Sequence, residues 1–432
     1  MRFMTTLALC ASTLALSAGI AQAQTAPGAP GEPPTWSSAA KIGAGASYEA
    51  YVEGQYRDGG PTGEVSKVWF SIADGVLTET MWGLIHEAQI KQMRMAVVIG
   101  DEVVVEGQDT DFAIDYLTKD DEGRPLSPSY RVTTRDRQGR FEIEKRIFTD
   151  PSGQALVVRV QVRALTASVV PFVLLEPHMA NTGVGDRGEA EVDGLFAHEG
   201  DTHLALVPDV PFTATSVGFV GVSDGLTDLR DNGRMNRAYA TTGEASGNIM
   251  LTGALPRVRP GRTLSRDFVI GFGSDAGSAE AEAREAHEAG LDRVQAEYDG
   301  TGSAIGWSDW LASLDQLPRL AEQSTDGGKL AYASALMLKV QEDRTHSGAL
   351  IASLSNPWGD TVDATQSSTG YKAVWPRDFY QVAMAMLALG DTQTPLAAFR
   401  YLPQVQVRAD TPGNTGATGW FLQKTHVDGE IE

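Results

Sequence analysis

Along the first two-thirds of the chain, hydrophobic and polar residues alternate in short runs that are typical of β-strands. The clearest runs are residues 65–72, 95–99, 141–148 and 155–162, and turn sequences rich in Asp, Gly and Pro occur at 58–61, 136–139 and 150–153. Many short strands with few helical stretches predict an antiparallel β-sandwich, in which two sheets bury their apolar faces against each other. We expect this domain to cover residues 35–275.

The spacing of apolar residues changes to a helical period after about residue 323. Apolar positions there recur every three or four residues, which places them on one side of an α-helix. The predicted helices span 329–344, 379–389 and, more briefly, 395–401, and their apolar faces consist of Leu330, Ala333, Met337 and Val340 in the first and Val382, Met386 and Leu389 in the second. Pro376 suits the first turn of the second helix and Gly390 suits its end, because a first turn needs no amide proton and glycine tolerates a left-handed conformation.

Between these two parts, residues 271–276 carry the pattern Gly-x-Gly-x-x-Ala between a predicted strand and a helical segment, 278–298. This pattern resembles a dinucleotide fingerprint, but that site needs a second parallel strand with an acidic residue at its end. Trp307, Trp310 and another amphipathic stretch follow instead. We therefore interpret the segment as the last strand of the sandwich followed by a helical linker, residues 276–322.

The start of the chain indicates an exported protein. Residues 1–23 combine a basic start, a small apolar run and a small-x-small sequence ending at Ala23, as a secretory signal does. The apolar run is too short to predict a membrane span. Cys10 is the only cysteine and lies in the signal, so we expect no disulfide and no cysteine-bound metal in the mature chain. Residues 24–34, rich in Ala, Pro, Gly and Gln, are expected to form a flexible leader.

The charge of the chain restricts its partners. Its 432 residues contain 35 Lys and Arg against 56 Asp and Glu, a formal net charge of -21. Such a field repels nucleic acid and anionic membrane surfaces, whereas a neutral polysaccharide is not repelled. We expect a monomer in the periplasm or the medium, without a nucleic-acid partner.

The densest cluster of aromatic and charged residues is 371–378, Tyr-Lys-Ala-Val-Trp-Pro-Arg-Asp. A Trp face can cover the C–H groups of a sugar, and Arg377 and Asp378 can form hydrogen bonds with neighbouring hydroxyl groups. The same residues also suit a purely structural arrangement, in which an Arg–Asp pair caps a helix beside a core Trp. The residue types alone leave both interpretations open.

Residues 348–359, Gly-Ala-Leu-Ile-Ala-Ser-Leu-Ser-Asn-Pro-Trp-Gly, together with 371–378, resemble the start of the catalytic domain of bacterial glucoamylases and glucodextranases. These are inverting, exo-acting α-glucosidases. The resemblance implies that Arg377 and Asp378 hold the terminal glucose and that Tyr371 and Trp375 form an aromatic wall. Two further loop tryptophans suit either the core or a sugar platform. The expected substrate-binding residues are Tyr371, Trp375, Arg377, Asp378, Trp358 and Trp420.

The resemblance also implies the architecture. Residues 65–79 resemble the start of the N-terminal β-sandwich of bacterial members, and residues 323–432 would form the beginning of an (α/α)6 toroid that is cut short. In the family both catalytic Glu residues follow the loop that 419–429 resembles, so we expect them beyond Glu432 and predict no catalytic residue here. Glu430 is not assigned that role.

No cofactor is predicted. The seven His residues show no HExxH pattern, and a turn between His198 and His203 suits a polar surface loop better than a zinc site. An acidic loop could hold structural calcium, but it lacks the Gly and the bidentate Glu of an EF-hand, which favours a solvated loop. Its residues are Asp109, Asp111, Asp115, Asp120 and Asp121.

Two functional hypotheses remain. The first is an exo-acting α-glucosidase acting on an α-glucan or oligosaccharide; the sequence does not distinguish α-1,4 from α-1,6 linkages, and trehalose-cleaving relatives share the toroid. The second is a non-catalytic carbohydrate-binding β-sandwich fragment.

Overall fold

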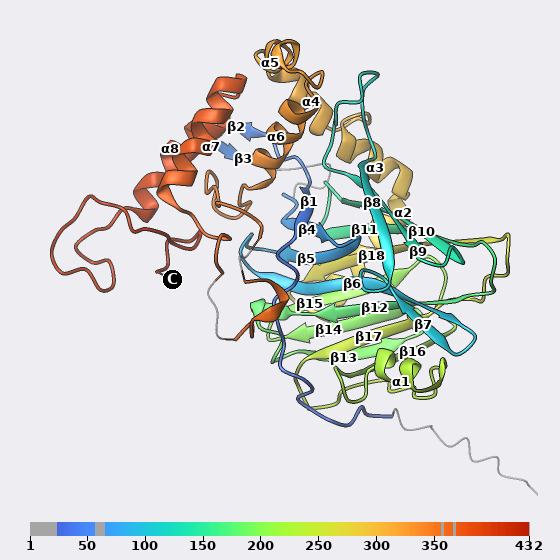
Figure 1. The fold of residues 1–432 in the computed structure, drawn as a ribbon. Helices are drawn as coiled ribbons and strands as arrows, with labels where there is room; N and C mark the ends of the chain where they lie inside the picture. Colours follow the sequence, from blue (N-terminus) through green and yellow to red (C-terminus); the bar gives the residue numbers. More distant parts are fainter. Residues whose placement is uncertain (1–23, 57–64, 356–357, 366–368, 432) are drawn as a thin grey trace, which may run out of the picture.

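The computed structural model describes residues 24–56, 65–355, 358–365 and 369–431. It shows a large β-sandwich with a group of helices at one end (Figure 1). The predicted signal, 1–23, and the predicted turn at 58–61 lie outside the described residues. Among the helices of the described part, none combines the length and the apolar character needed to cross a membrane.

The first sheet contains eight strands, and all of its pairings are antiparallel. Their order is β1 (Lys41–Ala46), β4 (Val68–Ala73), β5 (Val76–Trp82), β6 (Ala88–Ile99), β12 (Val170–Pro177), β17 (Ile249–Ala254) and β16 (Ala214–Phe219), with β7 (Glu102–Val105) paired to β6. The second sheet is also antiparallel, in the order β13 (Arg187–Glu191), β14 (Gly194–Glu199), β15 (Thr202–Pro208), β18 (Thr263–Gly273), β11 (Ala155–Ala164), β10 (Phe141–Thr149), β9 (Tyr130–Asp136) and β8 (Thr110–Tyr116). The predicted antiparallel sandwich is thus confirmed.

The core of the sandwich follows from the alternation in the strands. In β10, Phe141, Ile143 and Ile147 point inward and are fully or almost fully buried, while intervening residues are partly exposed. Lys145 lies on the same inward face, where its ammonium contacts the carboxylate of Glu106 at 2.7 Å. A buried cation needs such a partner, because an unpaired charge is costly inside a protein.

The helices follow the sandwich, apart from α1 (Gly225–Asn232), which packs on the outer face of the first sheet. The others are α2 (Ala276–Ala289), α3 (Leu291–Asp299), α4 (Trp307–Ser313), α5 (Leu317–Gln323), α6 (Lys329–Val340), α7 (Pro376–Leu389) and α8 (Gln393–Val405), with short 3-10 turns at Met179–Asn181 and Gly359–Thr361 and a small hairpin of β2 (Tyr51–Val52) and β3 (Gln55–Tyr56). The prediction of one helical segment over 278–298 is wrong in one respect. Gly290, with φ +86°, divides the segment into α2 and α3.

The Gly-x-Gly pattern has a packing explanation. Strand β18 pairs antiparallel with β11 and β15, so the parallel arrangement of a dinucleotide site is absent from this part of the fold. Helix α2 turns back onto β18, and a Cβ atom at Gly271 would lie 2.2 Å from the carbonyl oxygen of Ala279. A Cβ atom at position 273 would lie 2.3 Å from Oγ of Ser278. Both glycines allow the helix to approach the strand.

The apolar face predicted for the first C-terminal helix is rotated from the one that α6 buries. Leu330 is 70% exposed, whereas Tyr332, Ala335 and Leu336 are buried. Lys339, one helical turn further along α6, is buried on the same side as these residues. In α7 the predicted face is confirmed, because Val382, Met386 and Leu389 are all buried, and Gly390 ends the helix at φ +102°.

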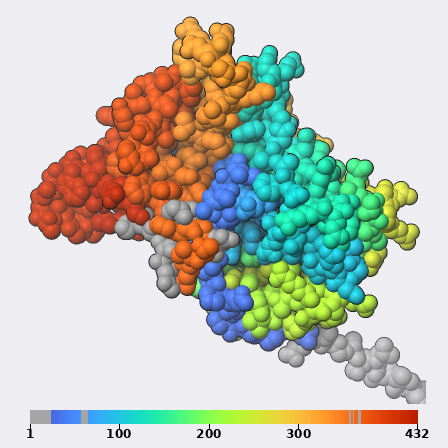
Figure 2. All heavy atoms as spheres, viewed as in Figure 1, coloured from blue at the N-terminus to red at the C-terminus, as the bar shows by residue number. Residues whose placement is uncertain are grey.

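Residues 24–34, for which a flexible leader was predicted, are hydrogen-bonded to the sandwich. The amide of Ala26 donates to the carbonyl of Thr241 at 2.9 Å, and the amide of Glu32 donates to Val220 at 2.9 Å. Polar composition does not prevent docking, because the backbone groups find partners beside the edge strands β16 of the first sheet and β13 of the second. In Figure 2 this segment, in blue, lies against the lime-coloured part of the sandwich, and the red C-terminal segment forms a lobe on the opposite side.

Candidate functional site

The two segments that carry the sequence resemblance lie side by side. The amide of Ala352 donates to the carbonyl of Ala373 at 3.0 Å, and the amide of Ser353 donates to the carbonyl of Tyr371 at 3.0 Å. A backbone bridge between Val374 and Thr425 holds the other edge of the second segment. Residues from three parts of the chain therefore fix the entrance of α7.

Local sequence explains why α7 begins here. Trp375 is the N-cap in an extended conformation, and Pro376 occupies the first turn, where its missing amide proton costs nothing. Asp378 also lies in the first turn, where a carboxylate interacts favourably with the helix dipole. This places Arg377 and Asp378 at the N-terminal end of α7, directly beside Trp375.

The predicted aromatic wall consists of two neighbouring rings. The centroids of Tyr371 and Trp375 are 6.4 Å apart, at an angle of 57°. Tyr371 is 45% exposed and Trp375 is half-buried, so both present ring surface to solvent. The ammonium of Lys424 lies 5.7 Å from the Trp375 centroid, within range of a cation–π contact.

Arg377 and Asp378 form an exposed ion pair. Nη2 of Arg377 lies 3.1 Å from Oδ2 of Asp378, and their side chains are 75% and 32% exposed. An exposed pair of this kind contributes about 0–1 kcal/mol to stability. The donors of Arg377 and the acceptors of Asp378 are therefore accessible to a ligand. A pair that served only to cap the helix would not need this exposure.

The two remaining predicted residues stand on separate loops. Trp358 is 37% exposed, near the end of the first segment, and it directly precedes the 3-10 turn Gly359–Thr361. Trp420 is 44% exposed, and its indole donates to the carbonyl of Ala417 at 3.0 Å. The structure thus brings Tyr371, Trp375, Arg377 and Asp378 together in one turn and leaves Trp358 and Trp420 on other loops.

A buried ion pair beneath this turn was missed by sequence reasoning. Lys372 is fully buried, and its ammonium lies 3.4 Å from Oε1 of Glu79 in β5 and 4.6 Å from the centroid of Trp36. Lys41 contacts the other carboxylate oxygen of Glu79 at 3.2 Å. Burial by itself raises the pKa of Glu79, but the ammonium groups of Lys372 and Lys41 outweigh it and lower that pKa.

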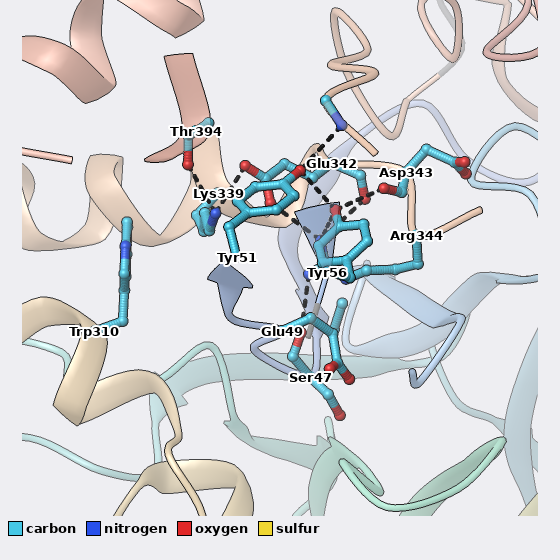
Figure 3. Close-up of polar contacts among 12 residues, drawn as sticks. Ser47, Glu49, Tyr51, Tyr56, Trp310, Lys339, Glu342, Asp343, Arg344 and Thr394 are labelled. Carbon is cyan, nitrogen blue, oxygen red and sulfur yellow. Dashed lines mark hydrogen bonds and ion pairs between the residues drawn. The ribbon is translucent and has the colours of Figure 1, made fainter. Parts of the chain in front are cut away.

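A second set of buried charges joins the helices to the sandwich (Figure 3). We call Tyr51, Tyr56, Lys339, Glu342 and Arg344 the junction cluster. Nζ of Lys339 donates to Oε1 of Glu342 at 2.9 Å, and Nη1 of Arg344 donates to the other carboxylate oxygen at 3.2 Å. Nη1 of Arg344 also donates to the Tyr56 hydroxyl at 3.1 Å.

The aromatic members of the junction cluster come from the small hairpin β2–β3. The hydroxyl of Tyr51 donates to that of Tyr56 at 2.9 Å, and their rings stack at 4.4 Å. The ammonium of Lys339 lies 4.5 Å from the Tyr51 centroid. Burial raises the pKa of both phenols, so they stay neutral donors beside the charges.

These buried charges are distinct from a catalytic pair. Each of the carboxylates of Glu79 and Glu342 is held by two cations, which leaves neither arranged as a free acid or base. A signal was present in the sequence, because Lys339 interrupts the apolar run Leu-Met-Leu-Lys-Val at 336–340 and Lys372 stands in an aromatic motif. We interpret the pair of Lys372 and Glu79 as the support of the turn before α7, and the junction cluster as the link between α6 and the sandwich.

The acidic loop considered for calcium does not converge. Asp111 lies 3.5 Å from Arg137, Asp115 lies 2.5 Å from Lys119, and Asp120 lies 2.5 Å from Arg124. Each of these three carboxylates thus has its own cation. His198 and His203 face each other across β14 and β15, with ring centroids 5.0 Å apart.

Comparison with known proteins agrees with this architecture. The family model described as glucodextranase, domain N, matches residues 26–312, and the model described as glycosyl hydrolases family 15 matches residues 326–411. The chain belongs to the glucodextranase N-domain family. The resemblance to bacterial glucoamylases and glucodextranases predicted from the sequence is thereby confirmed.

Two glucoamylases are similar over most of the chain. A glucoamylase of Clostridium sp. (strain G0005) is 30% identical over 400 residues, covering 90% of this chain and 51% of that protein. The crystal structure of a bacterial glucoamylase complexed with acarbose matches with a TM-score of 0.80 and 28% identity, over 95% of this chain and 55% of that one. The chain therefore spans about half the length of the relatives that it matches. The order of sandwich and helices is that of a glucoamylase fold.

Proposed function

We propose that the chain supplies the N-terminal sandwich and the glucose-binding turn of an exo-acting α-glucosidase. The observation that carries this proposal is the backbone pairing of residues 352–353 with 371–373, which presents Trp375, Arg377 and Asp378 at the start of α7. The match to glycosyl hydrolases family 15 over residues 326–411 supports it.

In the proposed complex, the terminal glucose of an α-glucan lies against Tyr371 and Trp375. The half-exposed rings offer an apolar surface to the C–H groups of the sugar. Arg377 donates to neighbouring hydroxyl groups, and Asp378 accepts from them. The ion pair between them is exposed, so exchanging part of it for sugar hydroxyls costs little.

The proposed reaction is hydrolysis with inversion. It requires one carboxylic acid to protonate the leaving oxygen and one carboxylate to activate water, about 6.5–9.5 Å apart. We assign neither role to a residue of this chain. What its own residues do is bind and orient the glucose unit at the bond to be cleaved, which lowers the entropic part of the barrier.

The alternative is sugar binding without hydrolysis, and it shares the same turn. Isothermal titration of the chain with maltotriose, isomaltotriose and trehalose measures binding, and an assay for glucose released by the full-length protein separates the two. Binding with release of β-glucose supports the glucosidase and names the linkage. Binding that is lost in Arg377→Ala, without release of glucose, supports the binding function alone. An absence of both binding and release overturns the proposal.

We also propose that the protein is exported, on the signal-like sequence at residues 1–23. Sequencing the N-terminus of the protein from the periplasm or medium tests this. A mature chain that begins at Gln24 is expected, and one that retains Met1 would contradict export by cleavage.

A further inference from the structure

A tight turn near the end of the described chain gathers three metal-binding side chains. The amide of His426 donates to the carbonyl of Glu430 at 3.0 Å, and the amide of Gly429 donates back to His426 at 3.1 Å. The side chains of His426, Asp428 and Glu430 come together at this turn. A ring nitrogen of His426 and one carboxylate oxygen each from Asp428 and Glu430 lie within 4.8 Å of one another.

A second imidazole, from the sandwich, lies against this turn. His86, between β5 and β6, is 3% exposed, and its ring stacks on that of His426 with centroids 4.4 Å apart and planes at 25°. Nδ1 of His86 and Nε2 of His426 are both buried, and neither has a hydrogen-bond partner among the described residues. Buried polar atoms without partners are rare, because each loses its hydration without replacement.

The surroundings of the two rings are rich in negative charge. Asp343 has a fully buried side chain, and its carboxylate accepts from the backbone amide of Ile85, next to His86. Asp428 and Glu430 place two further carboxylates beside the His426 ring, and carboxylates gathered in this way favour a bound cation.

We propose that His426, Asp428 and Glu430, with His86 beside them, form a binding site for a zinc-class divalent ion. Imidazole nitrogen combined with carboxylate oxygen suits Zn²⁺, whereas Ca²⁺ and Mg²⁺ prefer oxygen ligands alone. Nε2 of His426, which is buried without a hydrogen-bond partner among the described residues, is the atom that such an ion would satisfy.

The position of the site indicates its role. His86 belongs to the sandwich, and the turn 426–430 follows Thr425, whose backbone pairs with Val374 just before α7. An ion held by the turn would fix the part of the C-terminal segment that packs on His86 of the sandwich, close to the candidate sugar-binding turn. This inference does not depend on the proposed glucosidase activity.

Metal binding to the whole chain tests the proposal. The protein is treated with EDTA, dialysed and titrated with Zn²⁺ by calorimetry, with Ca²⁺ and Mg²⁺ as comparisons, and Co²⁺ is added to record its visible absorption. We expect one Zn²⁺ per chain, a rise in the melting temperature, and a tetrahedral Co²⁺ spectrum. Binding of no ion, or of Ca²⁺ in preference to Zn²⁺, would overturn the proposal.

Variants locate the ion. Asp428→Asn changes an exposed residue, so the fold should persist while Zn²⁺ affinity falls at least tenfold. His426→Ala should lower it as well. His203→Ala is the matched control, because it removes one ring of the other stacked histidine pair. Zn²⁺ binding that is lost in His203→Ala and kept in Asp428→Asn would place the ion elsewhere and refute this site.

Discussion

The ammonium of Lys372 lies 3.4 Å from Oε1 of Glu79, which connects the turn before α7 to strand β5 of the sandwich. Both side chains are fully buried. Glu79 is also held by Lys41 from β1, so one carboxylate links two strands of the sandwich to the turn. The position of Trp375 and Arg377 thus depends on a contact with a distant part of the sequence.

Replacing Lys372 with Met should destabilise the protein by about 3 kcal/mol, because it removes one of two cations from a buried carboxylate. Urea unfolding, followed by tryptophan fluorescence, measures the change. Lys329→Met, at the exposed start of α6, is the control and should stay within about 0.5 kcal/mol of the parent. A Lys372→Met variant as stable as this control would show that the pair does not support the fold.

Arg377→Ala should weaken maltooligosaccharide binding by about 2–4 kcal/mol, because sugar hydroxyls and Asp378 would lose their partner in the complex. Stability should change by less than about 0.5 kcal/mol, since the Arg377 side chain is 75% exposed. Titration calorimetry and thermal unfolding measure the two effects separately. The capping interpretation makes the opposite prediction, with lower stability and unchanged affinity.

Gly271→Ala should destabilise the protein by about 1–3 kcal/mol, because its methyl group would meet the carbonyl oxygen of Ala279 at 2.2 Å and push α2 from the strand. Gly277→Ala is the matched control within α2. Its added Cβ has its nearest neighbour at 3.3 Å, and alanine favours a helix. Thermal unfolding compares the two. Equal melting temperatures would contradict the packing role assigned to Gly271.

The sequence predicted those features of the fold that depend on local pattern. Strands β10 and β11 and the turn between them follow from alternation and from Asp150-Pro-Ser-Gly153, and α7 follows from its apolar spacing, Pro376 and Gly390. These signals lie within a few residues of the element that they specify, so no tertiary contact is needed to recognise them.

Features that depend on distant partners were not predictable in this way. Lys339 is buried because Glu342, Thr394 and the Tyr51 ring surround its ammonium, and Thr394 and Tyr51 are far from it in the chain. For the same reason α6 turns Lys339 inward and leaves Leu330 at the surface. Of the candidate site, the turn 371–378 was recognisable by composition, whereas its support by Glu79 was visible only in the structure.

Glu49 gives the fold a pH dependence. It is 6% exposed and accepts from the amide of Ser66 at 2.9 Å; burial raises its pKa from 4.5 to about 7, although Arg344 acts in the opposite direction. Between these values the folded chain keeps a proton that the unfolded chain releases. The free energy of unfolding therefore falls as pH rises from about 4.5 to 7, by an amount on the order of 3 kcal/mol from this residue.

Glu49→Gln should remove this contribution, because the amide stays neutral and keeps an oxygen for the Ser66 amide. The variant should match the parent near pH 4.5 and exceed it in stability at pH 8, where the parent carries a buried charge. Urea unfolding across this range measures the difference, and Glu53→Gln, at an exposed position of the adjacent hairpin turn, serves as control. If the difference between Glu49→Gln and the parent is the same at every pH, the protonation assigned to Glu49 is wrong.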